Sequence, residues 1–348
     1  MRTLAFLLLA APVLAPAAVD PCAPPEAELK ERALAIVERA TLGTDARVLV
    51  AAAGWWRVGQ GMPWQDEAAP EALYARAADL AGPDAVAWSM LARSCGRDCL
   101  LQPAPIERWV ALDADNAAAW VALAGRALHA NDDAAAHAAV ARAAHAPRFD
   151  GYWVETLRAS VAATRSVPLT PALERDIERQ GFSARDGMDV EAFGVALAHA
   201  MPGLGSVIEA CAAHPDWRVD CLRLARTIEA TGDSFVVQAQ ARALQRRLLD
   251  EGSADARALA ERVRAHEWRV LRMIELTDEP EEMAPMLRRL LATGSEVRAT
   301  EQALREAGIP VVPPPGWTSE QGQAELRQAA VERREPDDCP PPAAPSKP

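Results

Sequence analysis

The chain has 348 residues, of which half are apolar and only 5% are aromatic. Abundant alanine with few aromatic side chains favours closely packed helices over a β-sandwich or barrel, in which β-branched and aromatic residues dominate. The formal net charge of −12 argues against nucleic acid as a partner, because phosphate binding needs a basic face. It also argues against an anionic membrane surface, since no basic amphipathic segment offsets it.

Residues 1–18 have the pattern of a secretory signal peptide, in which Arg2 precedes an apolar run and Ala15–Ala17 fit a cleavage site. Prolines interrupt the run, which is shorter than the roughly 20 apolar residues of a membrane-spanning helix. A lipoprotein at Cys22 is disfavoured, because the residues before it are not all small. We therefore expect a soluble mature chain in the periplasm of a Gram-negative bacterium, with secretion as the alternative.

Residues 19–44 are predicted to form an N-terminal segment with one helix, because apolar residues from Leu29 to Val37 recur at helical spacing. From 45 to 150, helical stretches of roughly 10–15 residues alternate with turns. The breaks lie at 59–70, 82–84, 113–116, 130–133 and 146–151.

Residues 151–335 continue the alternation of helices and turns without a regular period. Serine and acidic residues at several predicted starts fit helix N-caps. The remaining residues, 336–348, form a proline-rich tail that cannot pack a core. The predicted helices are 152–164, 171–180, 189–200, 204–213, 217–231, 235–250, 254–274, 280–292, 296–307 and 319–333.

The stretches 82–92 and 114–124 match each other, with Trp88 and Trp120 standing 32 residues apart. A period of 32 to 34 residues is typical of stacked helix pairs. The segment 45–150 resembles the tetratricopeptide repeat family: two units match clearly, and a third, from 45 to 82, matches weakly. A generic bundle of α-hairpins remains the alternative. The fold class that we expect is all-α, with a repeat array that continues into an irregular helical bundle or solenoid. The family positions are matched by Trp88, Leu91, Ala92, Ala104, Ala111, Trp120, Leu123, Ala124, Ala136, Val140, Ala143 and Pro147.

The resemblance implies a concave surface, lined by the first helix of each pair, that holds peptides or protein segments. The side chains expected on this surface differ from those of the basic grooves with which some family members bind a terminal carboxylate. In the alternative interpretation, the same side chains only contact the next helix pair and bind no partner. The residues placed on this surface are Arg93, Arg97, Val121, Leu128 and His129.

Six cysteines follow the predicted cleavage site, and an even number in an exported chain suggests disulfides. The spacing favours Cys95 with Cys99 and Cys211 with Cys221, which leaves Cys22 with Cys339. Intermolecular pairing of the two terminal cysteines, and hence a homodimer, is the alternative.

Trp55, Trp56 and Trp64 lie in or beside the loop at 59–70, where aromatic side chains could anchor a partner. Alternatively, Trp55 and Trp56 close the N-terminal core. We find no metal-ligand spacing, no hydrolase motif and no phosphate loop, so we expect neither a metal nor a cofactor.

The sequence therefore predicts a non-catalytic scaffold or adaptor that binds protein or peptide partners. The alternative is a thiol-disulfide or other enzyme of the cell envelope that acts through Cys95 and Cys99.

Overall fold

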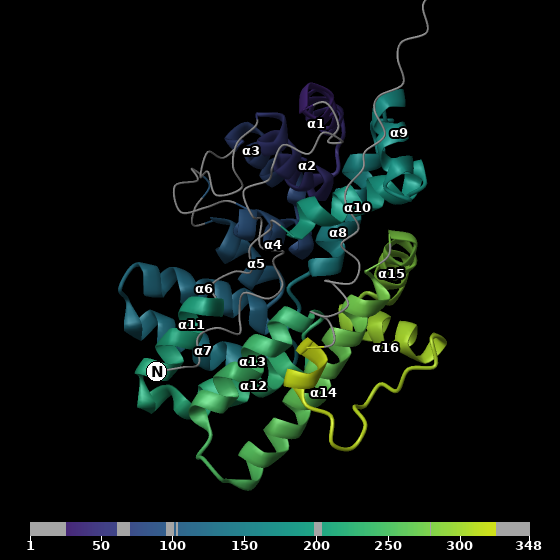
Figure 1. Cartoon of the computed structure of the whole chain (residues 1–348). Helices are drawn as coiled ribbons and strands as arrows, with labels where there is room; N and C mark the ends of the chain where they lie inside the picture. The colour runs from purple at the N-terminus through teal and green to yellow at the C-terminus, as the bar shows by residue number, and fades with distance from the viewer. Residues whose placement is uncertain are drawn as a thin grey trace, which may run out of the picture.

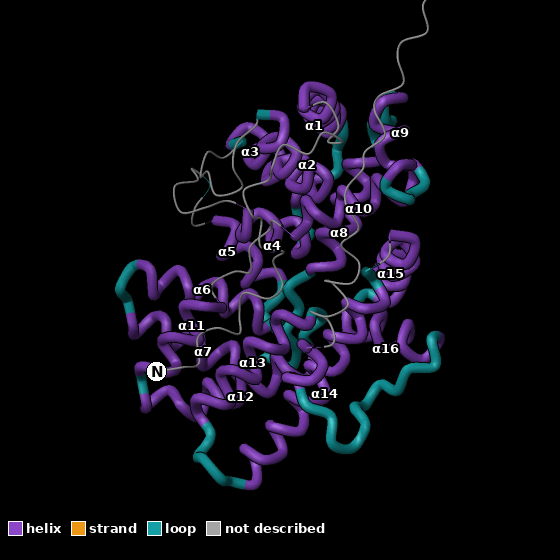
Figure 2. Tube along the Cα trace, in the orientation of Figure 1, coloured by secondary structure: helices purple, strands orange, loops and turns teal. Residues whose placement is uncertain are grey.

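The computed structural model describes residues 26–60, 70–94, 101, 104–197, 204–278 and 280–324. Within these ranges the chain folds into the sixteen α-helices α1–α16, one short 3-10 helix and a further helical segment at 319–324, without a β-strand, which confirms the all-α prediction. Most of the described connections are short (Figure 2). No helix in the described ranges has both the length and the hydropathy needed to cross a membrane.

The first seven helices contain the predicted repeat region. Helices that follow one another in the chain pack together, α1 with α2, α2 with α3, α4 with α5 and α6 with α7. Their bounds are α1 (Glu26–Thr41), α2 (Ala46–Gly59), α3 (Glu71–Ala81), α4 (Ala85–Ser94), α5 (Ala104–Leu112), α6 (Ala117–His129) and α7 (Asp133–His145).

The second half follows the predicted helices closely, but α10 begins five residues before its predicted start. Ser183 accounts for the difference, because its hydroxyl accepts the N–H of Asp186 and caps the helix. Helix is described for 319–324, and the rest of that predicted segment lies outside the described residues. The bounds are α8 (Trp153–Arg165), α9 (Pro171–Arg179), α10 (Ala184–Leu197), α11 (Leu204–Ala213), η1 (Pro215–Trp217), α12 (Arg218–Thr231), α13 (Phe235–Leu248), α14 (Ala254–Leu276), α15 (Pro280–Thr293) and α16 (Glu296–Glu306).

The 32-residue correspondence is visible in hydrogen bonds as well as in sequence. Trp88 donates its indole N–H to the carbonyl of Gly82 over 2.9 Å, and Trp120 donates to the carbonyl of Ala114 over 2.8 Å. Each bond reaches six residues back, across the turn that precedes a first helix. The two units therefore share a local geometry, which the shared turn and tryptophan predicted.

The second half folds back onto the array (Figure 1). Helix α8 packs against α2, α11 packs against α6, and α12 packs against α7. One cluster of buried side chains runs from Ala33 in α1 to Leu248 in α13, so the hydrophobic core continues across the predicted boundary at 150. A smaller cluster joins α8 and α10 to α15 and α16 around Leu157 and Leu287.

A disulfide joins Cys211 at the end of α11 to Cys221 in α12, which confirms that predicted pair. Both cysteines are buried, and the bond closes the corner formed by η1. The indole of Trp217 fills this corner, and the imidazoles of His137 and His214 stack on it. The other four cysteines, Cys22, Cys95, Cys99 and Cys339, lie outside the described residues.

Candidate functional site

The surface formed by the first helices of the array is covered by the chain itself. Arg93, predicted to face an open groove, is only 8% exposed and donates to the hydroxyl of Thr156 in α8 over 2.6 Å. Burial lowers the pKa of its guanidinium to about 10. Val121 is fully buried in the main core. The prediction that Arg93 and Val121 line an open surface is therefore wrong, because the second half packs over the helices that carry them.

The other predicted groove residues differ in exposure. Leu128 is half-buried, and His129 is exposed at the C-terminal end of α6. Arg97 lies outside the described residues. The end of α6 is thus the described part of the predicted groove that solvent reaches.

The two described tryptophans of the predicted aromatic patch belong to the core. Trp55 is 4% exposed and donates its indole N–H to the hydroxyl of Thr164 in α8 over 3.1 Å, while Arg32 lies over its ring. Trp56 is half-buried and packs against the same core. These contacts favour the alternative in which Trp55 and Trp56 close the N-terminal core. Trp64 lies outside the described residues.

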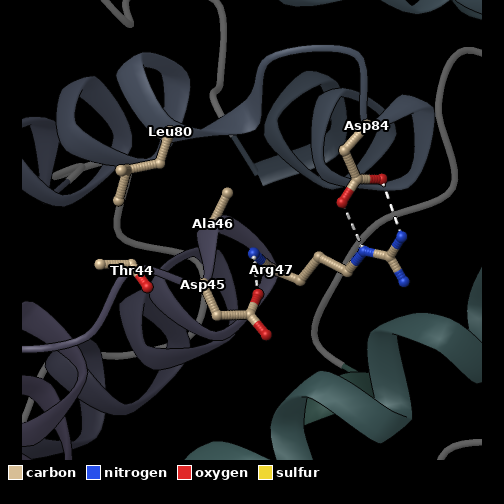
Figure 3. A pocket seen from close by; sticks show the side chains of 6 residues that line it. All are labelled: Thr44, Asp45, Ala46, Arg47, Leu80 and Asp84. Atoms are coloured by element: carbon tan, nitrogen blue, oxygen red, sulfur yellow. Dashed lines mark hydrogen bonds and ion pairs between the residues drawn. The ribbon is translucent and has the colours of Figure 1, made fainter.

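A shallow depression of about 430 Å³ lies where the turns before α2 and α4 meet (Figure 3). At its side, Arg47 donates from Nε and Nη2 to the two carboxylate oxygens of Asp84, over 2.6 and 2.9 Å. This two-bond geometry fixes the guanidinium in one orientation. The depression is lined by Thr44, Asp45, Ala46, Arg47, Leu80 and Asp84.

The depression is built from helix caps. Asp45 accepts the N–H groups of Arg47 and Val48 at the start of α2, and Asp84 accepts those of Val86 and Ala87 at the start of α4. Asp84 therefore caps one first helix and binds an arginine from the preceding one. The Arg47–Asp84 pair was not predicted from the sequence, although the aspartate in the Gly-Pro-Asp turn is a recognisable cap signal.

The charges of this pair stabilise each other. Partial burial raises the pKa of Asp84, but the hydrogen bonds from Arg47 and from the amides of α4 outweigh it, so the pKa lies below its usual value. The hydrogen bond to Asp84 likewise raises the pKa of Arg47. Both groups therefore stay ionised across the neutral pH range.

An exposed leucine stands just before the turn that leads into α4, and another stands just before the turn that leads into α6. Leu80, in the last turn of α3, is 38% exposed, and Leu112, at the equivalent position 32 residues later in α5, is 40% exposed. Equivalent positions of stacked helix pairs lie along one edge of an array. We call the surface formed by the six residues of the depression together with Leu112 the turn edge.

The described residues contain no group of three histidine, cysteine, aspartate or glutamate side chains placed to hold a metal ion. Comparisons of the chain with protein-family models, with curated proteins and with solved structures found no match.

Proposed function

We propose that this protein is a non-catalytic helical-repeat scaffold, similar to tetratricopeptide repeat proteins, that binds protein partners in the periplasm. The observation that supports this proposal is the turn edge, where exposed leucines recur at the period of the repeat and the first of them, Leu80, lies beside a fixed Arg47–Asp84 pair. Single exposed leucines are common on protein surfaces. Their recurrence at equivalent positions gives the edge a regular pattern that an extended partner can follow.

The location of the proposed binding surface follows from the packing. Helix α8 of the same chain packs on α2 and α11 packs on α6, while Arg93 of α4 is hydrogen-bonded to α8. Burial of a large aliphatic side chain contributes roughly 1.5–3 kcal/mol. Because α11 buries Leu204, Val207 and Ile208, displacing it would cost several kcal/mol before a partner gained any contact. A partner can bind the turn edge, or the exposed end of α6 at His129, without displacing α11.

A crosslinking pull-down from periplasmic extract tests the proposal. The mature chain is compared with a Leu80→Asp/Leu112→Asp variant, which places charge at both equivalent positions. Val219→Asp is the matched control, since Val219 is 70% exposed on α12, outside the array. We expect one set of proteins to be captured by the native chain and the control and lost with the double variant. Equal capture by all three chains would contradict binding at the turn edge.

The alternative enzyme is tested separately by alkylation of the native, unreduced chain. A thiol at Cys95 or Cys99 that reacts rapidly at neutral pH would support thiol-disulfide chemistry, because reactivity requires a lowered thiol pKa. Electrophoresis without reductant tests whether Cys22 or Cys339 joins two copies into a homodimer.

A further inference from the structure

A proline-rich segment follows the end of α16 and packs on α14; it is the yellow loop of Figure 1. Gly308, with φ 71°, marks the end of α16, and the N–H of Ile309 donates back to the carbonyl of Leu304 over 2.8 Å. Residues 308–317 then lead to the helical segment at 319–324. We call residues 308–317 the proline strap.

The proline strap is fixed at both ends and in its middle. Near its start, the carbonyl of Pro310 accepts the indole N–H of Trp268 in α14 over 2.7 Å. At its end, the ring of Trp317 packs edge-on against Trp268, with 5.3 Å between the ring centroids. Ile309 packs against the same two rings, and Pro313 is buried. The strap therefore has a defined conformation rather than that of a free loop.

Three consecutive prolines, at 313–315, set the backbone of the second half of the strap. A proline ring fixes its own φ near −65°, and the residue before a proline is held in the extended region, so this stretch adopts the polyproline II conformation. The chain then turns at Gly316, which has φ 81°, and the N–H of Trp317 donates to the carbonyl of Pro314 over 3.2 Å. Because the conformation is already fixed, a partner that binds it pays little for ordering it.

The side chains on the outer side of the strap are apolar. A polyproline II helix has three residues per turn, so residues three apart lie on one edge. Val312 and Pro315 are such a pair: Val312 is 66% exposed, and Pro315 is exposed as well. Pro314 is exposed beside them, whereas Pro313 faces the protein. The outer edge of the strap is thus an ordered apolar ridge in solvent.

The backbone of this ridge can accept hydrogen bonds but has few donors, because proline lacks an N–H. A matching partner surface therefore supplies flat apolar side chains together with hydrogen-bond donors. The inner side of the strap shows this chemistry within the chain itself. Trp268 lies against Ile309 with its ring and donates its indole N–H to the carbonyl of Pro310. Aromatic side chains with a polar N–H or O–H combine both properties.

We propose that the outer edge of the proline strap, formed by Val312, Pro314 and Pro315, binds in a groove of a partner protein that is lined by aromatic side chains. Such grooves recognise polyproline II segments through apolar residues that stand three apart. The proposal concerns other residues than the turn edge and does not depend on the binding function proposed for it.

Photocrosslinking in the intact periplasm tests this proposal. The full mature chain carries the photoreactive residue p-benzoylphenylalanine in place of Val312. We expect irradiation to join the chain to one partner protein, and mass spectrometry to place the new bond beside aromatic residues of that partner. The same photoreactive residue in place of Val219, which is 70% exposed on α12, is the matched control and should not give this product.

The dependence on proline separates recognition of the strap from chance contact. Pro314→Ala/Pro315→Ala should lower the yield of the product roughly tenfold, because alanine frees the backbone; a loss of about 1.4 kcal/mol in binding corresponds to that factor. Both prolines are exposed, so the variant should keep the thermal unfolding of the native chain.

Synthetic peptides complete the test. An excess of a peptide with the sequence of residues 308–317 should suppress the product, whereas the same peptide with alanine at 313–315 should not. An unchanged yield with the Pro314→Ala/Pro315→Ala variant would overturn the proposal. So would a product formed only with a second copy of this chain, or the absence of any product from the photoreactive residue at position 312.

Discussion

Asp84 shows how one side chain can hold two neighbouring units of the array together. It caps α4 and at the same time binds Arg47 of α2 through two hydrogen bonds. Loss of an N-cap typically costs about 1 kcal/mol, whereas a partly exposed ion pair contributes about 0.2–1 kcal/mol. The cap is therefore the larger of the two contributions.

Asp84→Ala should lower the free energy of unfolding by about 1–2 kcal/mol, because it removes both contributions. Arg47→Ala removes only the ion pair and should cost less than about 1 kcal/mol. Urea denaturation of the two variants measures the difference. An Arg47→Ala variant that is as unstable as Asp84→Ala would show that the ion pair, rather than the cap, stabilises this turn.

At the residue scale, local signals were predictable and distant contacts were not. The spacing of Cys211 and Cys221 predicted their disulfide, and Ser234 and Ser253 cap the helices that follow them, as expected. The environments of Arg93 and Val121 depend on segments far along the chain. No local sequence pattern indicates which distant helix will pack on a given face of a helix.

At the element scale, periodicity predicted most helices, because a helix is a local structure with a local apolar period. It did not predict that α8 and α11 cover the array. One signal was present: α2 is buried at every position from Leu49 to Trp55. A helix that is apolar on all sides is enclosed on all sides. The run of Val, Ala, Gly and Trp in α2 is therefore evidence against an open groove over this helix.

The corner between α11 and α12 depends on its disulfide. A Cys211→Ala/Cys221→Ala variant should lose roughly 2–3 kcal/mol of unfolding free energy, because the bond closes a short loop in the unfolded chain. Thermal and urea denaturation without reductant provide the measurement. Reductant should then leave the variant unchanged unless other disulfides exist, so a further loss of stability would report bonds among Cys22, Cys95, Cys99 and Cys339. A variant as stable as the native chain would contradict a stapling role.

At the scale of the whole molecule, three titratable groups whose pKa is shifted by desolvation make stability depend on pH near neutrality. Asp233 and Glu296 have a raised pKa in the folded chain, so folding favours their protonated forms. Their contribution to stability is fully present below the pKa values of the unfolded chain and is lost as pH rises through about 6 and 7. His266 acts in the opposite direction, because burial lowers its pKa to about 3 and the unfolded chain binds its proton more readily.

Between pH 8 and pH 5, Glu296 should add about 3 kcal/mol to the free energy of unfolding and Asp233 about 1 kcal/mol, while His266 removes about 2 kcal/mol. The native chain should therefore be more stable at pH 5 than at pH 8. Glu296→Gln should reverse this order, because His266 then dominates. Thermal unfolding across this range measures both chains. A native chain that is less stable at pH 5 would contradict the raised pKa values.

The packing of α8 on α2 also has a consequence for biosynthesis. The hydrogen bond between Trp55 and Thr164 spans 109 residues of chain. A ribosome adding roughly 10 residues per second needs about ten seconds to make that length. During this interval the apolar face of the array has left the ribosome without its own cover. Until α8 has been made and has packed on α2, this apolar face is exposed to aggregation.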